Sequence, residues 1–389
     1  MSFRTAGIIP QTMIIRITDP PGYGTAVSES FLENRFDVVS RSGLHITEAH
    51  LINALPTLSH PARMLILGNR TGTLGMIANR FHDALAVVVS SLDIFHHHAI
   101  ERNLARNPFI SVTARCEPDI PERDLFDTVC LQLSAGGMAD ELILDLLQQS
   151  HLALRKDGTL MVAAEEDIPW LAEHMKKSFG ACSLRGTEQT STLLVSRKKK
   201  ELKKLKDYRA EFTMTTPGGK AVQLVTRPGV FAHRRVDEGA QALAEVALTK
   251  PGDTILDMGC GCGSIGLTLA VNQPSARVCF VDSHSRAVHA TEQNCRANGL
   301  TDYKVILNDE GPPPDMGGFT LFVGNPPYYS NDRISDFFIQ TAYKSLLSGG
   351  RAYVVGKKAA HNAEMMKALF GNSEIILRRG YEIAKSVKS

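Results

Sequence analysis

Short apolar runs alternate along the chain with longer segments in which apolar residues recur at helical spacing. In the second half these runs are "DTILDM", "ARVCFVD", "KVILND", "FTLFVGN" and "GRAYVVG". Their length and continuity are typical of strands that are buried on both faces of a parallel sheet. Because helical stretches separate them, the pattern predicts a doubly wound α/β unit.

The first half repeats this order of elements at a nearly constant offset. Asn294 falls 191 positions after Asn103, and an offset of 192 brings "LLSGGRAYVVG" onto "LRKDGTLMVAA". Self-similarity across most of each half predicts an internal duplication. We therefore expect two tandem Rossmann-like domains of the α/β class, residues 1–196 and 211–389.

The segment between these domains, residues 197–210, is strongly basic. Its core, "RKKKELKKLKDYR", has eight basic and two acidic residues and no apolar face. It is either a solvated linker or a basic strip that contacts RNA phosphates. Since the net charge of the chain is only +2, any binding of nucleic acid has to come from such a local patch.

Composition narrows the class of protein. With 43% hydrophobic and 22% charged residues, the chain is ordinary for a globular protein, and its length favours two cores. No window reaches the roughly 18 consecutive apolar residues of a membrane helix, and the N-terminus lacks the order of a signal peptide. We expect a cytoplasmic protein without a membrane partner. The seven cysteines form no CxxC pair, so free thiols are favoured and no metal site is expected.

A glycine-rich turn, "ILDMGCGCGSIGLTLA", follows the first strand of the second half. Glycines permit close backbone approach, and a helix N-terminus adds unpaired amides, so a nucleotide-like cofactor fits over this turn. We assign Asp257, Gly259, Gly261 and Gly263 to cofactor binding. Asp282, at the end of the next strand, is placed to accept hydrogen bonds from both hydroxyls of a ribose.

Two further polar residues, Asn308 and Asp309, follow the third strand of the second half and are candidates to lie near an adenine amino group. The first half has lost the matching features. Its turn "ILGNRTGTLG" is two residues shorter, and Ser91 stands opposite Asp282. We expect the first half to bind no cofactor.

The run "FVGNPPYYSND", residues 322–332, places an amide and two tyrosines beside two prolines at a strand end. Proline fixes φ and keeps the residue before it extended, so the loop is stiff. A polar amide on a stiff loop next to aromatic rings indicates a recognition surface for a flat group that carries an amide or an amine.

Together, "DMGCGCGSIG", "FVDS" and "NPPY" resemble class I S-adenosylmethionine-dependent methyltransferases that act on nitrogen. The longer pattern adds a degenerate first copy and "RPGVFAHRRVDEGAQAL" ahead of the glycine turn. Over nearly the whole chain this resembles the bacterial ribosomal RNA guanine-N2 methyltransferases of the RsmC and RlmG type. That family usually has Phe and then His after the two prolines. Here Tyr328 and Tyr329 follow, which leaves the target nucleotide open.

The resemblance implies S-adenosylmethionine as cofactor and a monomeric enzyme. Its partner is ribosomal RNA, with 16S favoured over 23S, or an assembly intermediate of a ribosomal subunit. It also implies that the first domain is a degenerate methyltransferase domain, which we expect to dock RNA and support folding. Whether naked RNA or an assembled subunit is the substrate stays open.

In a guanine, the lone pair of the exocyclic amine is delocalised into the ring. The side-chain oxygen of Asn325 and the carbonyl of Pro326 are suited to accept its two N–H bonds as charge develops. A tyrosine can stack on the base. Asp237 is either part of the wall of the methionine pocket, together with Gln241, or a helix N-cap. Our assignments are, for catalysis, Asn325, Pro326, Pro327 and Tyr328; for cofactor binding, Asn325 in addition to the residues above; and for the substrate base, Phe231, Tyr328 and Tyr329.

Two alternatives remain. The Asn-Pro-Pro-aromatic motif also occurs where adenine N6 or a protein glutamine is methylated, and it does not separate these acceptors from guanine. A catalytically silent RNA-binding assembly factor is an alternative of another class. The intact Asp257, Asp282 and "NPPY" argue against it, because a silent factor has no need for cofactor-binding residues.

Overall fold

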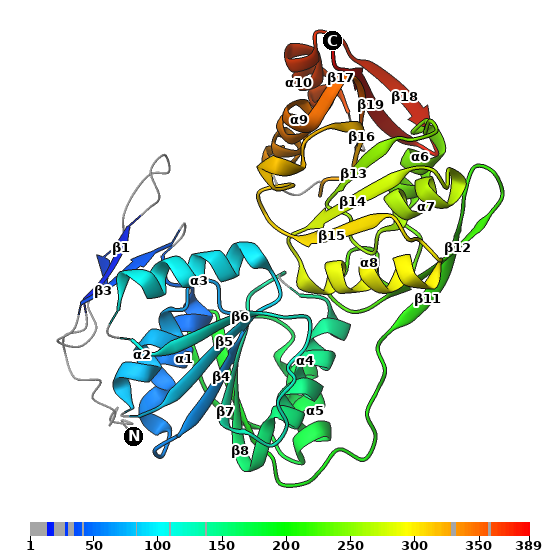
Figure 1. The fold of residues 1–389 in the computed structure, drawn as a ribbon. Coiled ribbons are helices and arrows are strands. Elements are labelled where there is room, and N and C mark those ends of the chain that lie inside the picture. Colours follow the sequence, from blue (N-terminus) through cyan, green and yellow to red (C-terminus); the bar gives the residue numbers. More distant parts are fainter. Residues whose placement is uncertain are drawn as a thin grey trace. The chain divides into compact units, whose positions relative to one another are not determined.

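The structure is a computed structural model of the chain. It describes residues 14–18, 28–29, 35–40, 43–82, 84–108, 110–136, 138–327, 332–356 and 359–389. The chain divides into two compact units, residues 1–207 and 208–389. In each unit a sheet is covered by helices (Figure 1).

The main sheet of the first unit has, within the described residues, seven strands in the order β6-β5-β4-β7-β8-β10-β9. The strands are β4 Arg63–Leu67, β5 Ala86–Ser91, β6 Val112–Cys116, β7 Phe126–Leu133, β8 Leu154–Ala164, β9 Ser183–Glu188 and β10 Ser191–Arg197. The helices are α1 Ile46–Ala54, α2 Thr73–Phe81, α3 Ile94–Arg106, α4 Asp140–Ala153, α5 Ile168–Phe179 and the 3₁₀ helix η1 Leu55–Thr57. A small sheet of order β2-β1-β3 precedes them, with β1 Ile14–Thr18, β2 Ser28–Glu29 and β3 Arg35–Val39.

The second unit repeats this topology, in the order β15-β14-β13-β16-β17-β19-β18. The strands are β13 Thr254–Met258, β14 Arg277–Asp282, β15 Tyr303–Leu307, β16 Phe319–Gly324, β17 Leu346–Gly356, β18 Glu374–Arg378 and β19 Tyr381–Val387. The helices are α6 Glu238–Val246, α7 Ser264–Asn272, α8 Ser285–Ala297, α9 Arg333–Ser345, α10 Ala360–Phe370 and the 3₁₀ helix η2 Pro314–Met316. A hairpin of β11 Ala210–Thr215 and β12 Ala221–Thr226 precedes them.

The strands of each unit are continuous apolar runs because both faces of the sheet are buried. In β13 the neighbours Ile255 and Leu256 belong to different core clusters, one on each face of the sheet, and both are fully buried. The prediction of tandem Rossmann-like α/β units is confirmed. The expectation of parallel strands is incomplete, because β10 and β19 run antiparallel to their neighbours.

The internal repeat extends to individual hydrogen bonds. The Asn103 Nδ2 on α3 donates to the carbonyl of Thr71 at 2.8 Å. The Asn294 Nδ2 on α8 donates to the carbonyl of Cys262 at 2.9 Å. The two donors are 191 positions apart in the sequence, and so are the two acceptors. In both units, therefore, the same hydrogen bond connects the turn after β4 or β13 to the second helix that follows it, α3 or α8.

The basic segment between the units departs from the expectation in one residue. Arg197 ends β10, and Lys198 is buried at 1% exposure. Its Nζ donates to Asp124 Oδ1 at 2.6 Å and to the Leu154 carbonyl at 2.9 Å. Lys198 therefore cannot belong to a basic strip that contacts phosphates, because its ammonium group is buried and already paired with Asp124.

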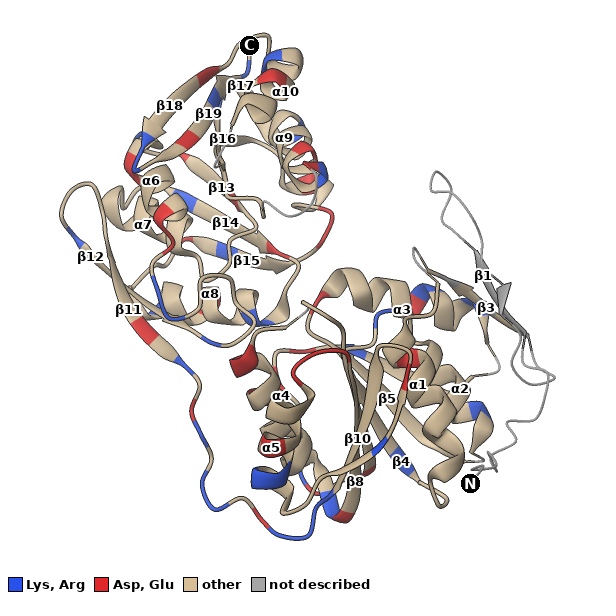
Figure 2. Cartoon of the chain, turned by 180° about the vertical axis from the view of Figure 1, so that it is seen from behind, with Lys and Arg blue, Asp and Glu red and all other residues tan. Residues whose placement is uncertain are grey.

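The lysines that follow are exposed, and Figure 2 shows basic residues spread along this segment. These lysines are Lys199, Lys200, Lys203, Lys204 and Lys206. The second unit has a similar lysine that is only half-buried, since the Lys388 Nζ donates to the Leu346 carbonyl at 2.7 Å. The repeat thus explains Lys198 as a residue that closes the end of its sheet.

The seven cysteines are free thiols, as the sequence predicts. In the described part of the chain, no helix has both the length and the apolar character needed to cross a bilayer. Across the same residues, His, Cys, Asp and Glu side chains form no group of three that could hold a metal ion.

Candidate functional site

The glycine turn lies between the end of β13 and the start of α7. Gly259, Gly261 and Gly263 have φ values of 67°, 60° and 78°, in the left-handed region that favours glycine. A Cβ at Gly259 would lie 2.8 Å from Phe338, and one at Gly263 would lie 2.9 Å from Thr291. A Cβ at Gly261 would meet no atom within 4 Å. The turn is thus packed against the fold on one side, while Gly261 leaves room for a ligand.

Asp282 holds this turn in place from the end of β14. Its Oδ2 accepts the Gly261 N–H at 2.8 Å, and its Oδ1 accepts the His284 N–H at 2.9 Å. Each carboxylate oxygen has a second lone pair. The predicted contact with ribose hydroxyls therefore has to share oxygens that already anchor the backbone.

Asp257 lies beneath the turn and is fully buried. Its Oδ2 accepts the Gly266 N–H at 2.8 Å, whereas its Oδ1 has no hydrogen-bond partner among the described residues. Burial raises the pKa of Asp257 to about 7; the nearby Asp282 charge also raises it, and the bond from Gly266 opposes the shift. Its position makes Asp257 a support of the turn and not part of the pocket wall.

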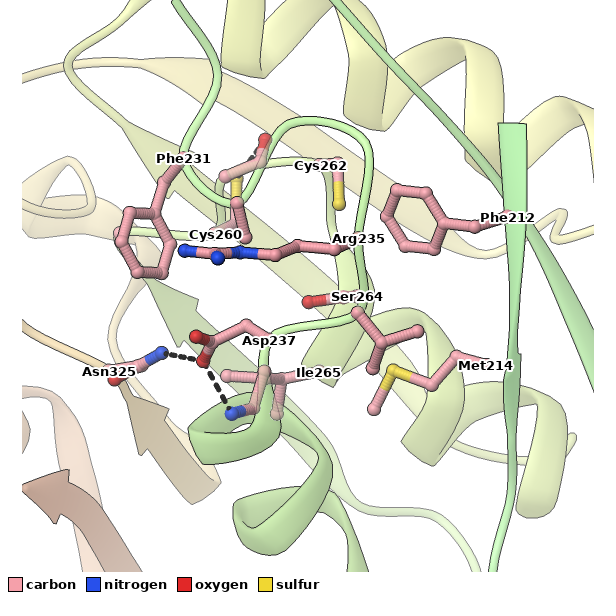
Figure 3. Close-up of a pocket in the computed structure, with 15 residues that line it drawn as sticks. Phe212, Met214, Phe231, Arg235, Asp237, Cys260, Cys262, Ser264, Ile265 and Asn325 are labelled. Atoms are coloured by element: carbon pink, nitrogen blue, oxygen red, sulfur yellow. Dashed lines mark hydrogen bonds between the residues drawn. The ribbon is translucent and has the colours of Figure 1, made fainter. Parts of the chain in front are cut away.

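A pocket opens above the turn, and its walls come from four parts of the unit (Figure 3). The first and second are the β11 strand of the hairpin and the loop that leads into α6. The third and fourth are the glycine turn with the start of α7, and Asn325 at the end of β16. The residues in these walls include Phe212, Met214, Phe231, Arg235, Asp237, Gly261, Ile265 and Asn325.

Asn325 is held by an aspartate from a distant part of the sequence. Its Nδ2 donates to the Asp237 Oδ2 at 2.9 Å, and the same oxygen accepts the Ala240 N–H at 2.8 Å (Figure 3). Asp237 is therefore the N-cap of α6, one of the two roles that the sequence left open. The Gln241 Nε2 donates to the Thr215 carbonyl, toward the hairpin.

The structure brings Phe231, Gly259, Gly261 and Asn325 together in one pocket. Phe231 lines the pocket and is 60% exposed, so its ring is available to a flat partner. Pro326 and Pro327 follow Asn325 directly, and Pro326 is buried.

Other predicted residues lie elsewhere. Asn308 follows β15, and its Nδ2 donates to the Gly311 carbonyl at 2.6 Å. It and Asp309 lie near the end of β14, where the Asn308 N–H bonds to the Asp282 carbonyl, but neither is among the residues that line the pocket. Tyr328 and Tyr329 fall outside the described residues.

Sequence reasoning missed several residues of the pocket wall, among them Phe212, Met214 and Arg235. Phe212 and Met214 belong to the hairpin, which apolar patterning alone did not identify. Arg235 lies across the pocket with its guanidinium group toward Phe231 (Figure 3). It could have been noticed as a basic residue beside "PGVF", and it supplies a positive charge for a carboxylate or a phosphate.

In the first unit, the matching turn after β4 is occupied by the side chain of Glu48. Glu48 on α1 is 2% exposed, and its Oε1 accepts the Asn69 Nδ2 at 2.8 Å and the Leu74 N–H at 3.0 Å. The Thr71 hydroxyl donates to the same oxygen at 3.2 Å. Burial raises the pKa of Glu48, and these three bonds oppose the shift.

Comparisons with known proteins agree with this geometry. Residues 221–385 match the family model described as the methyltransferase small domain. A ribosomal RNA small subunit methyltransferase C of Pseudomonas entomophila (strain L48) is 28% identical over 193 residues, covering 48% of this chain and 57% of the relative. A ribosomal RNA large subunit methyltransferase G of Pseudomonas putida (strain W619) is 24% identical over 349 residues, covering 85% and 89%.

A solved structure matches over both units. It is the 16S rRNA N2 methyltransferase RsmC of T. thermophilus in complex with AdoMet and guanosine. Its TM-score is 0.75 at 19% identity, and the match covers 97% of this chain and 98% of the other. At that identity the likeness establishes the fold.

The fold is that of a class I methyltransferase, and residues 221–385 match the methyltransferase small domain. The relatives and the whole-chain match together support the RsmC/RlmG type, so the resemblance seen in the motifs is confirmed. The aligned segments span 40%, 57% and 65% of three relatives' own lengths. The activity, substrate and partner of this chain are accordingly taken up as proposals.

Proposed function

We propose that the chain transfers a methyl group from S-adenosylmethionine to the exocyclic N2 amine of a guanine in ribosomal RNA. The observation that carries this proposal is the position of Asn325. The amide that follows β16 lies in the same pocket as the glycine turn that follows β13. A methyl donor held over the turn and an amine held at Asn325 would therefore be neighbours.

The residues of the pocket fit S-adenosylmethionine by their chemistry. Gly261 permits close approach, the start of α7 offers helix N-terminal amides, and Phe212 and Met214 provide apolar contacts. We assign Asp282 to the ribose, and Asn308 and Asp309 to the adenine side. When bound, the cofactor supplies an electrophilic methyl group on a sulfonium.

The chain's own part in the reaction is orientation and charge stabilisation. The Asn325 Oδ1 and the Pro326 carbonyl would accept the two N–H bonds of the amine and stabilise the positive charge that grows on nitrogen. Once the methyl group has been transferred, the nitrogen is acidic and releases one proton, which restores a neutral amine. Phe231 and Tyr328 would hold the base, with Tyr329 beside them, at roughly 1–3 kcal/mol for a stacked base. Alignment of the reacting atoms contributes much of the remaining acceleration.

The relatives' names support ribosomal RNA as the substrate. Guanine N2 is favoured because the structural match is an N2 methyltransferase with guanosine bound. We favour 16S RNA on the same match, while the relative aligned over 85% of the chain acts by its name on the large subunit. We further propose a monomer in the cytoplasm whose first unit docks RNA, helped by the exposed lysines from Lys199 to Lys206.

Mass spectrometry of nucleosides from separated 16S and 23S RNA tests this function in a strain that lacks the gene. N2-methylguanosine should fall by one residue per ribosome in one RNA and return when the gene is restored. Loss of N6-methyladenosine instead would indicate the adenine alternative. An unchanged RNA profile together with loss of a methylated glutamine in protein would indicate the glutamine alternative.

A further inference from the structure

One oxygen of Asp237 connects two parts of the site that lie 88 positions apart in the sequence. Its Oδ2 accepts the Ala240 N–H within α6 and the Asn325 Nδ2 at the end of β16, at 2.8 and 2.9 Å. The first bond is an ordinary helix N-cap. The second fixes a side chain of the pocket and has no part in capping the helix.

We propose that Asp237 is a positioning residue that locks the carboxamide of Asn325 in the orientation needed for methyl transfer. The inference rests on the proposed function. A carboxylate has only acceptors, so the half of the amide that faces Asp237 has to be the NH₂ group. The Oδ1, at the other end of the planar amide, then points away from Asp237 and is oriented as an acceptor for the amine of the substrate.

The lock matters because the two ends of a carboxamide have nearly the same shape and opposite hydrogen-bonding character. If Asn325 were turned over, its NH₂ group would face the N–H bonds of the amine, donor against donor. The charge that grows on the attacking nitrogen would then meet a positive dipole. A neutral hydroxyl at position 237 could donate or accept, so it would not select one orientation.

The first unit shows that the fold does not require this lock. At offsets of 192 and 193, His45 stands where Asp237 does and Gln132 where Asn325 does. The His45 ring nitrogen still caps α1 by accepting the Thr47 N–H at 3.4 Å. Gln132 instead accepts a bond from the Asn69 Nδ2 at 3.2 Å. The capping role is kept in both units, whereas at this pair of matching positions the second unit has a carboxylate bonded to a carboxamide and the first unit has His45 and Gln132.

A substitution at position 237 can separate the role of Asp237 as the N-cap of α6 from its role in orienting Asn325. Asp237→Ser keeps a good N-cap but replaces the carboxylate with a short hydroxyl. We expect its melting temperature and its affinity for S-adenosylmethionine to match the parent protein. Its single-turnover rate on substrate RNA should fall about 10–100-fold, by analogy with other residues that orient a reacting side chain. The matched control is His45→Ser in the first unit, which should leave the rate unchanged.

A charge swap provides the rescue. In the double variant that combines Asp237→Asn with Asn325→Asp, the new amide would donate to the new carboxylate, and that carboxylate would still present an acceptor to the amine. We expect the double variant to be faster than Asp237→Asn alone. If Asp237 were only structural, the swap would bring no recovery.

An NMR measurement that does not depend on catalysis tests the role of Asp237 separately from the proposed function. In the full chain labelled with ¹⁵N-asparagine, the side-chain NH₂ signals of Asn325, assigned by their loss in Asn325→Asp, should shift in Asp237→Ser. Unchanged signals, or a wild-type rate for Asp237→Ser at saturating cofactor, would overturn the lock. A parent protein that methylates no guanine but shows the shift would instead refute the function and leave the lock standing.

Discussion

The two units have the same strand order and the same ties around the first turn, yet their turns meet different partners. After β13 the turn opens into a pocket lined by Gly261, and after β4 the turn is closed by Glu48. The difference is chemical, because the Glu48 carboxylate accepts hydrogen bonds from buried donors of the first turn. A shared fold therefore does not imply a shared site.

The strand ends differ in the same way. The Asp282 Oδ1 and the Ser91 hydroxyl each accept the N–H of the residue two positions on, at 2.9 and 3.1 Å. Asp282 has a second oxygen that reaches Gly261, and Ser91 has none. The first unit thus keeps the hydrogen bond to the N–H at the start of the next helix. It lacks the second oxygen, which in Asp282 accepts the Gly261 N–H of the glycine turn.

The largest effect is expected from Asn325→Ala, at the position where the first unit has Gln132. The substitution removes an acceptor that is needed mainly as charge develops, so kcat should fall by roughly 10² to 10³, as for the loss of one oxyanion-hole donor. Binding of S-adenosylmethionine should change little. Single-turnover methylation at saturating cofactor measures the rate, and a rate near that of the parent would show that the assigned site is wrong.

Glu48→Ala tests whether the first turn depends on its internal carboxylate. The change leaves buried donors on Asn69, Thr71 and Leu74 without their acceptor, at about 1–3 kcal/mol for each unpaired group. Urea unfolding of the full chain should show an earlier transition for the first unit. The exposed Glu101→Ala is the control, and equal stability of the two variants would refute the role given to Glu48.

Lys198 and Lys199 are adjacent in the sequence and should behave differently. Lys198→Met loses the two hydrogen bonds of a buried ammonium group and should lower the free energy of unfolding by about 1–3 kcal/mol, without altering the salt dependence of RNA binding. Lys199→Met should leave stability unchanged and, if this lysine contacts a phosphate, reduce the salt slope by about 1. Salt-dependent binding and thermal unfolding of both variants check this contrast. A reduced salt slope for Lys198→Met would contradict its burial.

The raised pKa of Asp257 predicts a smaller effect, which concerns how the stability of the folded protein depends on pH. Its pKa is raised from 3.8 to about 7 in the folded protein. Between these values the folded state binds more protons at this site than the unfolded state, so the site lowers stability as pH rises. Asp257→Asn should weaken that fall, and the exposed Asp302→Asn should not. Melting temperatures of both variants, measured at pH values between these two pKa values, test this difference. Identical dependence of the melting temperature on pH in the two variants would be inconsistent with a raised pKa of Asp257.

Much of the fold can be predicted because it depends on local pattern. The runs that become β13 to β17 are apolar on both faces, and the helices between them show their period. β18 was missed because it lies at the sheet edge, where Ile375 and Leu377 stay exposed and no buried pattern forms. The hairpin of β11 and β12 was missed for a similar reason, since its strands are only half-buried.

Predicted residues meet in the candidate pocket where a local motif supplies them, as with Gly259 and Gly261 of the glycine turn and Asn325 ahead of the two prolines. Contacts between distant segments were not predictable. Nothing local to Asp237 reveals that it meets Asn325, and the charge run around Lys198 gives no sign that one member is buried. Such pairings depend on which strand ends the topology brings together, and that is decided by packing across the whole unit.

The second unit has a pocket at its glycine turn, and we expect this unit alone to bind the cofactor. Isothermal titration of the full chain with S-adenosylmethionine tests it most directly. We expect one molecule per chain, and binding weaker by about 1–3 kcal/mol in Asp282→Ala, the scale for hydrogen bonds to a charged group. Ser91→Ala, at the matching place in the first unit, should bind like the parent protein. Two molecules per chain, or no binding, would contradict the account.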